Sequence, residues 1–339
     1  MAKVLETFTH VYSIGLFGWT ILSRCCGDRW WWLFLLNTFA VYLFIPVPIL
    51  LIIALILRRR KIWISLVPTV ILTTCFYGIL FLPKLSWNSY PEQNITVMTY
   101  NVLGFNEQLV EIITAIQAAE ADVVTIQELN PSLAQLIEQE LTAEYPHQVL
   151  DPQVGVCGMG IISRYPLSTV KQDLSSPYWC GKSQLLKMQF KNTPVFLVNF
   201  HAIPPSLLGD TEGLEWTARQ REQQIRMIAE FIEAYSEPVI VLGDLNAAEQ
   251  STAYNIITAS LSDSWRNGGW GLGHTFPGAA SPGSSRPKIG GVLVPMWLVR
   301  IDYIFHSDDW ETQKAWLGPW DSSSDHRPVV ARLTYRLRN

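Results

Sequence analysis

The sequence predicts a layered α/β domain behind an apolar N-terminal region that crosses a membrane. Strand and helix patterns alternate from Ile95 onwards, which is typical of layered α/β folds. Two long uncharged runs precede that alternation. The charge divides at the same place: residues 1–93 hold eight Lys or Arg and three Asp or Glu, net +5, whereas residues 94–339 hold 17 and 26, net −9. A domain at net −9 lacks the overall positive field expected of a tight nucleic-acid binder, although a local basic patch could still exist.

The two uncharged runs predict membrane spans. Trp30 to Leu57 has 28 residues without a charge, and Ile62 to Pro83 has 22. Each exceeds the roughly 20 residues that a helix needs to cross a bilayer. A shorter apolar run of 13 residues at 11–23 is a candidate additional span. We therefore predict a membrane anchor at 1–83 with spans at about 30–57 and 62–83, a linker at 84–93, and the α/β domain at 94–339.

The basic block between the two long runs predicts the orientation. Residues 58–61 read Arg-Arg-Arg-Lys, and short loops rich in these residues stay in the cytoplasm. The chain is therefore expected in the cytoplasmic membrane as a multi-pass protein, with the α/β domain on the extracytoplasmic side. Cys157 and Cys180 are the only cysteines of that domain. An oxidising compartment leaves two alternatives for them, a disulfide or two reduced thiols.

Each element of the α/β domain follows from its residue pattern. Residues 95–102 are rich in β-branched and apolar side chains and predict a strand. Apolar residues at helical spacing predict a helix at 107–119, and a second helix at 131–141 has Pro131 just inside its start. The other strands are predicted at 122–128, 154–163, 185–190, 195–200, 239–242, 299–305 and 329–335, the other helices at 217–235 and 252–260, and a long loop at 274–299.

Polar side chains stand where several of these strands end. They are Asn101, Glu128, His201, Asp244, Asn246, Asp302, Asp325 and His326. Strands that end together place such groups on one edge of a sheet, and burying several acids there is costly without a cation. Oxygen ligands of this kind suit a hard ion, Mg²⁺ or Mn²⁺. The alternative is a purely structural hydrogen-bond network.

The segments around these residues resemble the endonuclease/exonuclease/phosphatase superfamily, whose fold is also called DNase I-like. The segments are Thr-Tyr-Asn101-Val, Ile-Gln-Glu128, Asn-Phe-His201, Gly-Asp244-Leu-Asn246-Ala, Arg-Ile-Asp302-Tyr-Ile-Phe and Ser-Asp325-His326-Arg-Pro-Val. All six occur in the family's order over about residues 94–336. The resemblance implies a four-layer α/β/β/α sandwich and hydrolysis of phosphate esters. Membrane-tethered bacterial members of the superfamily have a similar layout.

The resemblance also implies roles for the eight residues. The metal ligands would be Asn101, Glu128 and Asp325. The catalytic residues would be His201, Asp244, Asn246, Asp302 and His326. Within that set His326, oriented by Asp302, and Asp244 are joint candidates for activating water. Asn246 and His201 would donate hydrogen bonds to the phosphorane as its charge develops.

Three more residues and the substrate remain open at this point. Arg300 could touch a phosphate or lie on the surface, and His274 and Thr275 are candidates for positions near the site. We expect a phosphodiesterase or nuclease whose partners are a phosphate ester, either nucleic acid or a lipid head group, and the lipid bilayer; no protein partner is predicted. The alternatives are a phospholipid-directed phosphodiesterase or phosphatase and a non-catalytic membrane-bound scaffold.

Overall fold

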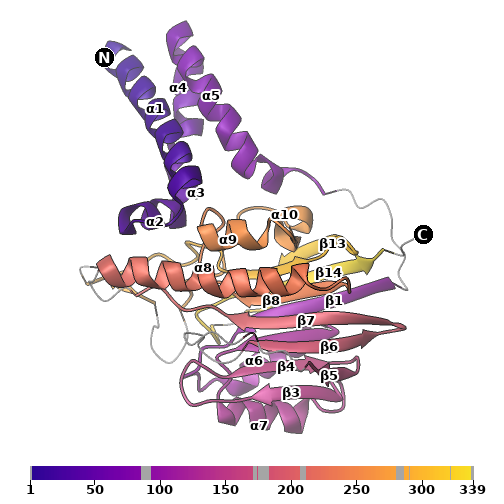
Figure 1. Cartoon of the computed structure of the whole chain (residues 1–339). Helices are drawn as coiled ribbons and strands as arrows, with labels where there is room; N and C mark the ends of the chain where they lie inside the picture. Colours follow the sequence, from indigo (N-terminus) through magenta and orange to yellow (C-terminus); the bar gives the residue numbers. More distant parts are fainter. Residues whose placement is uncertain are drawn as a thin grey trace.

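Two six-stranded sheets form the centre of the α/β domain (Figure 1). The computed structural model describes residues 2–84, 93–170, 174, 183–206, 211–279, 286–289, 291–320 and 322–336. The first sheet has the order β13 (Trp310–Leu317), β14 (Val329–Tyr335), β1 (Asn94–Asn101), β2 (Val123–Gln127), β4 (Met159–Ser163) and β3 (His147–Asp151). The second has the order β5 (Leu167–Thr169), β6 (Gln184–Phe190), β7 (Thr193–His201), β8 (Val239–Asp244), β12 (Asp302–His306) and β9 (Ser262–Asp263).

Helices cover the outer face of each sheet. The helices α6 (Leu109–Ala118) and α7 (Pro131–Glu140) pack on the first sheet, and α8 (Thr211–Glu233) and α9 (Thr252–Ile257) pack on the second. A short helix α10 (Ser264–Gly268) and a hairpin of β10 (Lys288–Ile289) and β11 (Val292–Leu293) complete the domain as described. The predicted four-layer α/β/β/α sandwich is confirmed.

The alternation of side chains along each strand decides which of them reach the space between the sheets. In β8, Leu242 packs between the two sheets, whereas Val241 packs beneath the outer helices. Asp244 lies two positions after Leu242 and therefore points into the same inner space. An even spacing also separates the polar residues at the ends of β1, β7 and β12, namely Asn101, His201 and Asp302, from the inward-facing Val97, Leu197 and Ile304.

Three helical passes stand away from the sandwich (Figure 1). They are α1 (Ala2–Cys26), α3 (Ala40–Leu43) continued by α4 (Pro46–Leu57), and α5 (Arg60–Tyr77) continued by the 3-10 helix η1 (Gly78–Phe81). By length and composition, two of these segments could cross a membrane, Ala40–Leu57 and Arg60–Phe81. The shorter predicted run at 11–23 lies inside α1.

The predicted span at 30–57 is not one helix. Residues Trp31–Thr38 form a separate helix, α2, which lies crosswise at the base of the other helices (Figure 1). A polar residue inside the apolar run explains the break. The amide of Asn37 donates to the carbonyl of Gly27 and to Asp28, and its oxygen accepts the indole N–H of Trp19. These bonds tie the end of α2 to the loop after α1, so the apolar run turns before α3.

The helical region and the sandwich are joined by specific polar contacts. Asp28 accepts the backbone N–H of Thr252 at the start of α9, and the backbone N–H of Asp28 donates to the Thr252 hydroxyl. The hydroxyl of Tyr42 in α3 donates to the carbonyl of Leu298 at 2.8 Å. On the other side, Arg266 of α10 donates to the carbonyl of Phe76 in α5. Most of the predicted linker, 85–92, lies outside the described residues.

The remaining differences from the predicted elements lie at edges and ends. The strands β13 and β3 were not predicted, because both are outermost strands of the first sheet and mix polar with apolar residues. The helix α8 begins at Thr211 rather than at 217. The strand predicted at 299–305 begins only at Asp302. Before that point the hydroxyl of Thr275 accepts the backbone N–H groups of Ile301 and Asp302 in place of a neighbouring strand.

Candidate active site

Strand register brings three of the predicted catalytic residues into one row. His201 of β7 pairs with Asp244 of β8, and Asp244 pairs with Asp302 of β12. All three side chains point between the sheets and are buried. The row ends where the strands end, so the sheet edge delivers one imidazole and two carboxylates to a single place.

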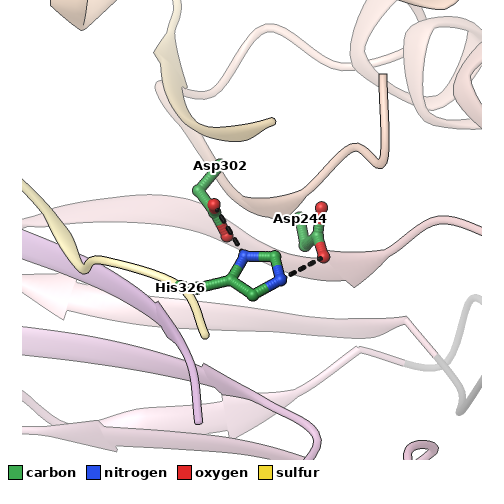
Figure 2. A group of neighbouring side chains, drawn as sticks. All are labelled: Asp244, Asp302 and His326. Atoms are coloured by element: carbon green, nitrogen blue, oxygen red, sulfur yellow. Dashed lines mark hydrogen bonds and ion pairs between the residues drawn. The ribbon is translucent and has the colours of Figure 1, made fainter. Parts of the chain in front are cut away.

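The loop before β14 adds a second imidazole to this row. Nδ1–H of His326 donates to Oδ2 of Asp302 at 2.9 Å, and Nε2 of His326 lies 4.0 Å from Oδ2 of Asp244 (Figure 2). The hydroxyl of Ser324 accepts the backbone N–H of His326 and donates to the carbonyl of Asn101. His326 is therefore fixed both at its ring and at its backbone.

Glu128 lies across from this row, at the end of β2. Its two carboxylate oxygens accept hydrogen bonds from Nδ2 of Asn101 at 3.0 Å and from the backbone N–H of Gly104 at 2.8 Å. Glu128 has a φ of 63°, a left-handed conformation that is unfavourable for this residue type. Such backbone conformations concentrate at functional sites, where the surrounding structure holds them in place.

Asn101 and Asn246 hold the carboxylates in position. Nδ2 of Asn101 also donates to Oδ2 of Asp244 at 3.1 Å, and Oδ1 of Asn101 accepts the N–H of Leu103. The backbone N–H of Asn246 donates to Oδ1 of Asp244, while its side-chain amide donates to the carbonyl of Ala202. The donors to the acids are therefore the side-chain amide of Asn101 and the backbone N–H of Asn246, whereas the Asn246 side chain is bonded to Ala202.

His201 completes the connection between Glu128 and the row. Its Nε2 lies 3.6 Å from Oδ2 of Asp244 and 3.9 Å from Oε1 of Glu128. Burial lowers the pKa of His201 despite the opposing negative charge of Asp244. His201 is therefore neutral at physiological pH.

The charges of the acids and of His326 depend on one another. Burial disfavours the charged imidazole of His326, but the charge and hydrogen bond of Asp302, together with Asp244, outweigh it and raise the pKa of His326 to about 10. Burial and the charge of Asp302 raise the pKa of Asp244 to about 6. Burial also raises the pKa of Glu128, and the neighbouring negative charge of Asp325 raises it further.

The acids are crowded enough to favour a bound cation. Glu128, Asp244, Asp302 and Asp325 are all at least largely buried, and Oδ1 of Asp302 is buried with no hydrogen-bond partner among the described residues. Single ligand atoms of Asp244, Asp302 and His326 lie within 4.8 Å of one another. Carboxylate oxygens in this number suit a hard divalent ion. The residues present therefore fit such an ion.

The other predicted residues are placed as follows. Thr275 supports the backbone of Asp302, and the ring of Phe276 next to it packs against the ring of His326 in a tilted arrangement, with 4.8 Å between centroids. Arg300 neither reaches the site nor lies on the surface, so both predicted alternatives were wrong. It is buried and forms ion pairs with Glu249 and Asp263, because the residues before Asp302 turn towards α10.

Sequence reasoning missed the polar layer beneath the site. The amide of Gln127 donates to Asn199 at 2.7 Å, which links the two sheets directly below the acids. Asn199 in turn donates to Gln184 at 2.9 Å. The signal was present in the sequence, since Asn199 and Gln127 stand at inward positions of their strands. Cys157 forms a disulfide, and Cys180 lies outside the described residues.

The sequence matches the Endonuclease/Exonuclease/phosphatase family over residues 98–326, which is more than half of the chain. A comparison with curated protein sequences finds no match.

Solved structures share the fold at low sequence identity. A protein of unknown function from Enterococcus faecalis V583 is 19% identical with a TM-score of 0.54, covering 71% of this chain and all of its own. A mannosyl-6-phosphatase from Bacteroides thetaiotaomicron VPI-5482 is 18% identical with a TM-score of 0.52, with the same coverage. D. rerio TDP2 with a single-strand DNA product is 18% identical with a TM-score of 0.54, covering 71% of this chain and 99% of its own.

The matched region contains the first five segments and the sixth as far as His326, and with them the acids that they bring together. Its fold, its buried carboxylates and its two histidines, each beside a carboxylate, agree with the chemistry of that family. The chain therefore belongs to the Endonuclease/Exonuclease/phosphatase family and is a phosphoester hydrolase.

Proposed function

We propose that the chain is a membrane-anchored, Mg²⁺-dependent phosphodiesterase that cleaves nucleic acid on the extracytoplasmic side of the cytoplasmic membrane. One observation supports the hydrolytic part above all others. Glu128, His201, Asp244 and the Asp302–His326 pair converge at one end of the two sheets, within 4 Å of their nearest neighbours in the group.

The metal ion would be held by Glu128 and Asp325, with Asn101 beside them. When bound, Mg²⁺ would neutralise negative charge on the phosphate and on the leaving oxygen. In the structure the Asn101 amide directs its N–H₂ group at Glu128, so ligation through its oxygen would need the amide to turn. Glu128 is then the principal anchor of the ion.

The two candidates for activating water differ in protonation. Despite burial, the charge and hydrogen bond of Asp302 raise the pKa of His326 to about 10 in the metal-free protein, which favours a protonated imidazole and the role of a donor. Asp244, whose raised pKa of about 6 lies close to neutrality, is suited to accept the proton of the attacking water. His326 would then stabilise the negative oxygens of the phosphorane, with the neutral His201 as a further donor.

The exposed face of the helical region supports membrane anchoring. Ile14, Ile56 and Ile64 on its three passes are 71%, 73% and 63% exposed. A soluble protein rarely leaves so continuous an apolar surface uncovered. The passes contact one another through small polar side chains, since Thr69 donates to the Ser13 hydroxyl and Ser13 donates to the carbonyl of Ser65. Such contacts are common between helices in lipid.

A phospholipid-directed phosphodiesterase is the second candidate, and one contact favours it. Tyr42 of α3 lies against the segment that supports Asp302: its ring is 6.3 Å from that of His274, the residue before Thr275. The anchor thus touches the support of the active site, which would keep the site close to the bilayer surface. A phosphodiester in a lipid head group would then be within reach.

The test uses full-length protein in a mild uncharged detergent. Plasmid DNA, RNA, bis(p-nitrophenyl) phosphate and phospholipid are each incubated with Mg²⁺, Mn²⁺ or EDTA. We expect nucleic acid to be cleaved with Mg²⁺ and not with EDTA, and His326→Ala to lower the rate roughly 10²- to 10⁴-fold. His147→Ala on the outermost strand β3 is the matched control.

Two results would change the conclusion. Full Mg²⁺-dependent turnover by His326→Ala would reject the site, and faster cleavage of phospholipid than of any nucleic acid would select the second candidate. Protease treatment of intact spheroplasts tests the orientation, because an extracytoplasmic domain is digested there before lysis. Digestion only after lysis would reject the proposed side of the membrane.

A further inference from the structure

We propose that Arg24, Arg29 and Arg219 form a binding site for the phosphate head group of an anionic phospholipid, separate from the hydrolytic site. This inference rests on the membrane anchoring proposed above. It concerns the junction between the C-terminal end of α1 and the helices α8 and α9 of the sandwich.

A cavity of about 490 Å³ opens at this junction. Its lining includes the guanidinium groups of Arg24, Arg29 and Arg219, with Glu222 as the only acid. The charge of the lining is therefore +2 when all four groups are ionised. Burial and the nearby Asp28 raise the pKa of Glu222, which weakens the one opposing charge.

The arginines do not form close ion pairs with carboxylates of the described residues. Within the described residues, Arg24 and Arg29 have no carboxylate partner, and each lies over an aromatic ring, Phe76 at 5.9 Å and Trp30 at 5.8 Å. Arg219 approaches Glu215 at only 3.9 Å, along the exposed side of α8. Stacking leaves the edge of a guanidinium free, and that edge is the part that binds phosphate oxygens in pairs.

The position of the cavity along α1 matches the head-group level of a bilayer. Lys3 and Arg24 are at opposite ends of one continuous helix, 21 residues apart. At about 1.5 Å per residue they are separated by about 31 Å, close to the roughly 30 Å of a hydrocarbon core. Figure 1 shows the end of α1 beside the sandwich and the loop between α4 and α5 at the far end of the helical passes.

Apolar surface continues from the cavity along α1, one turn towards the bilayer. Ile21 and Leu22 are 61% and 39% exposed, and Cys25 and Cys26 line the cavity itself. A phosphate on the arginines would therefore have its acyl chains against this apolar side. Free phosphate would bind only to the arginines, whereas a phospholipid would contact both the arginines and the apolar side of α1. A lining with net positive charge favours an anionic lipid over a zwitterionic one.

The test compares lipid binding by full-length protein and by the triple variant Arg24→Gln, Arg29→Gln, Arg219→Gln. Each is titrated with phosphatidylglycerol, phosphatidylcholine or inorganic phosphate in uncharged detergent, and bound lipid is counted by native mass spectrometry. The wild type should prefer phosphatidylglycerol. The triple variant should lose about a hundredfold in affinity for it, since each basic group near an anionic surface contributes roughly fivefold.

A control variant removes the same charge from the sandwich at three exposed residues that do not line the cavity: Lys191→Asn, Lys314→Gln, Arg332→Gln. It should bind phosphatidylglycerol like the wild type, and both triple variants should keep the wild-type rate on bis(p-nitrophenyl) phosphate. That rate separates a failure of this inference from a failure of the hydrolase assignment.

Four outcomes would overturn the inference. The triple variant could bind phosphatidylglycerol as tightly as the wild type, or phosphatidylcholine could bind equally well. Inorganic phosphate could compete at the same concentration as the lipid, which would identify a phosphate site without a lipid. Extraction of the chain from membranes by alkaline carbonate would remove the anchoring on which the inference rests, and would reject it too.

Discussion

Replacing Asp302 by Asn removes the carboxylate that holds His326, and the structure allows the consequence to be estimated. The pKa of His326 is raised from 6.5 to about 10. That difference corresponds to about 5 kcal/mol in favour of the charged imidazole. Burial acts in the opposite direction, so a variant without the charge of Asp302 leaves His326 with a much lower pKa. The imidazole then becomes neutral near physiological pH.

The sign of the pH dependence follows from these roles. In the proposed mechanism Asp244 is ionised and His326 is protonated, so activity should rise as pH passes the raised pKa of Asp244 and fall as pH approaches that of His326. A bound divalent cation lowers the pKa of His326, so both proteins are compared at one Mg²⁺ concentration. In Asp302→Asn the alkaline fall should move to lower pH by more than one unit, and the maximal rate should drop roughly 10²- to 10⁴-fold.

The folded state should show the same shift in stability. A raised pKa on His326 contributes stability that is complete below the unfolded value of about 6.5 and is lost as pH rises through about 10. The free energy of unfolding of the wild type should therefore fall as pH rises from about 6.5 to about 10. In Asp302→Asn this fall should be absent.

The assay is a profile of kcat/KM against pH on bis(p-nitrophenyl) phosphate, with ¹³C-histidine NMR of the metal-free protein as a direct readout. The chain has six histidines, and His326→Ala assigns the relevant signal. Asp308→Asn, an exposed acid shortly after β12, is the control. An unmoved alkaline limb in Asp302→Asn, or an imidazole that still titrates near 10, would refute the assigned roles.

Three further substitutions test other parts of the structure. Glu128→Gln removes the charge expected to hold the ion, so the Mg²⁺ concentration for half-maximal rate should rise at least tenfold and the rate should fall roughly 10²- to 10³-fold. Gly243→Ala would bring a Cβ to 1.9 Å from the carbonyl of Phe200 at a φ of 153°, so the melting temperature should fall by several degrees as β8 shifts. Tyr42→Phe removes the hydrogen bond to Leu298, so kcat should fall severalfold with KM unchanged, because the support of Asp302 loosens.

The Glu128 and Tyr42 variants each have a matched control. Glu138→Gln changes an exposed acid on α7 and should leave the Mg²⁺ dependence unaltered. Tyr12→Phe removes a comparable hydrogen bond, to the carbonyl of Leu43 inside the helical region, and should leave kcat unaltered. Equal loss of kcat in both tyrosine variants would point to general weakening of the helices. A Gly243→Ala protein with wild-type melting would show that β8 accommodates the methyl group.

Local patterns were sufficient to predict the strands that position the site. The apolar run of β8 ends in Asp244 and that of β2 is followed by Glu128, so the ends of the runs marked both acids. Edge strands such as β13 were missed because most of their residues are only partly buried and polar residues interrupt the apolar pattern. The break after α2 was missed as well, since it depends on the bonds of Asn37 to Gly27 and Asp28.

The supporting roles of loop residues could not be assigned from the sequence. Thr275 and Ser324 are ordinary polar residues by composition, and their roles arise from which backbone groups they meet. Arg300 stands two positions before Asp302 but faces away from the site, where Glu249 and Asp263 neutralise it. The position of Arg300 close to Asp302 in the sequence therefore did not indicate where the Arg300 side chain points.

The sequence by itself determined the order of the elements, the residue types at the strand ends and the family to which they belong, because period-two burial and strand-terminal polar groups are local features. Only the tertiary structure decided which groups meet. The pairing of β7, β8 and β12 sets His201, Asp244 and Asp302 side by side, and a loop more than 20 residues further on brings His326 to Asp302. Their protonation states follow from that proximity and from burial, and neither can be read from a linear chain.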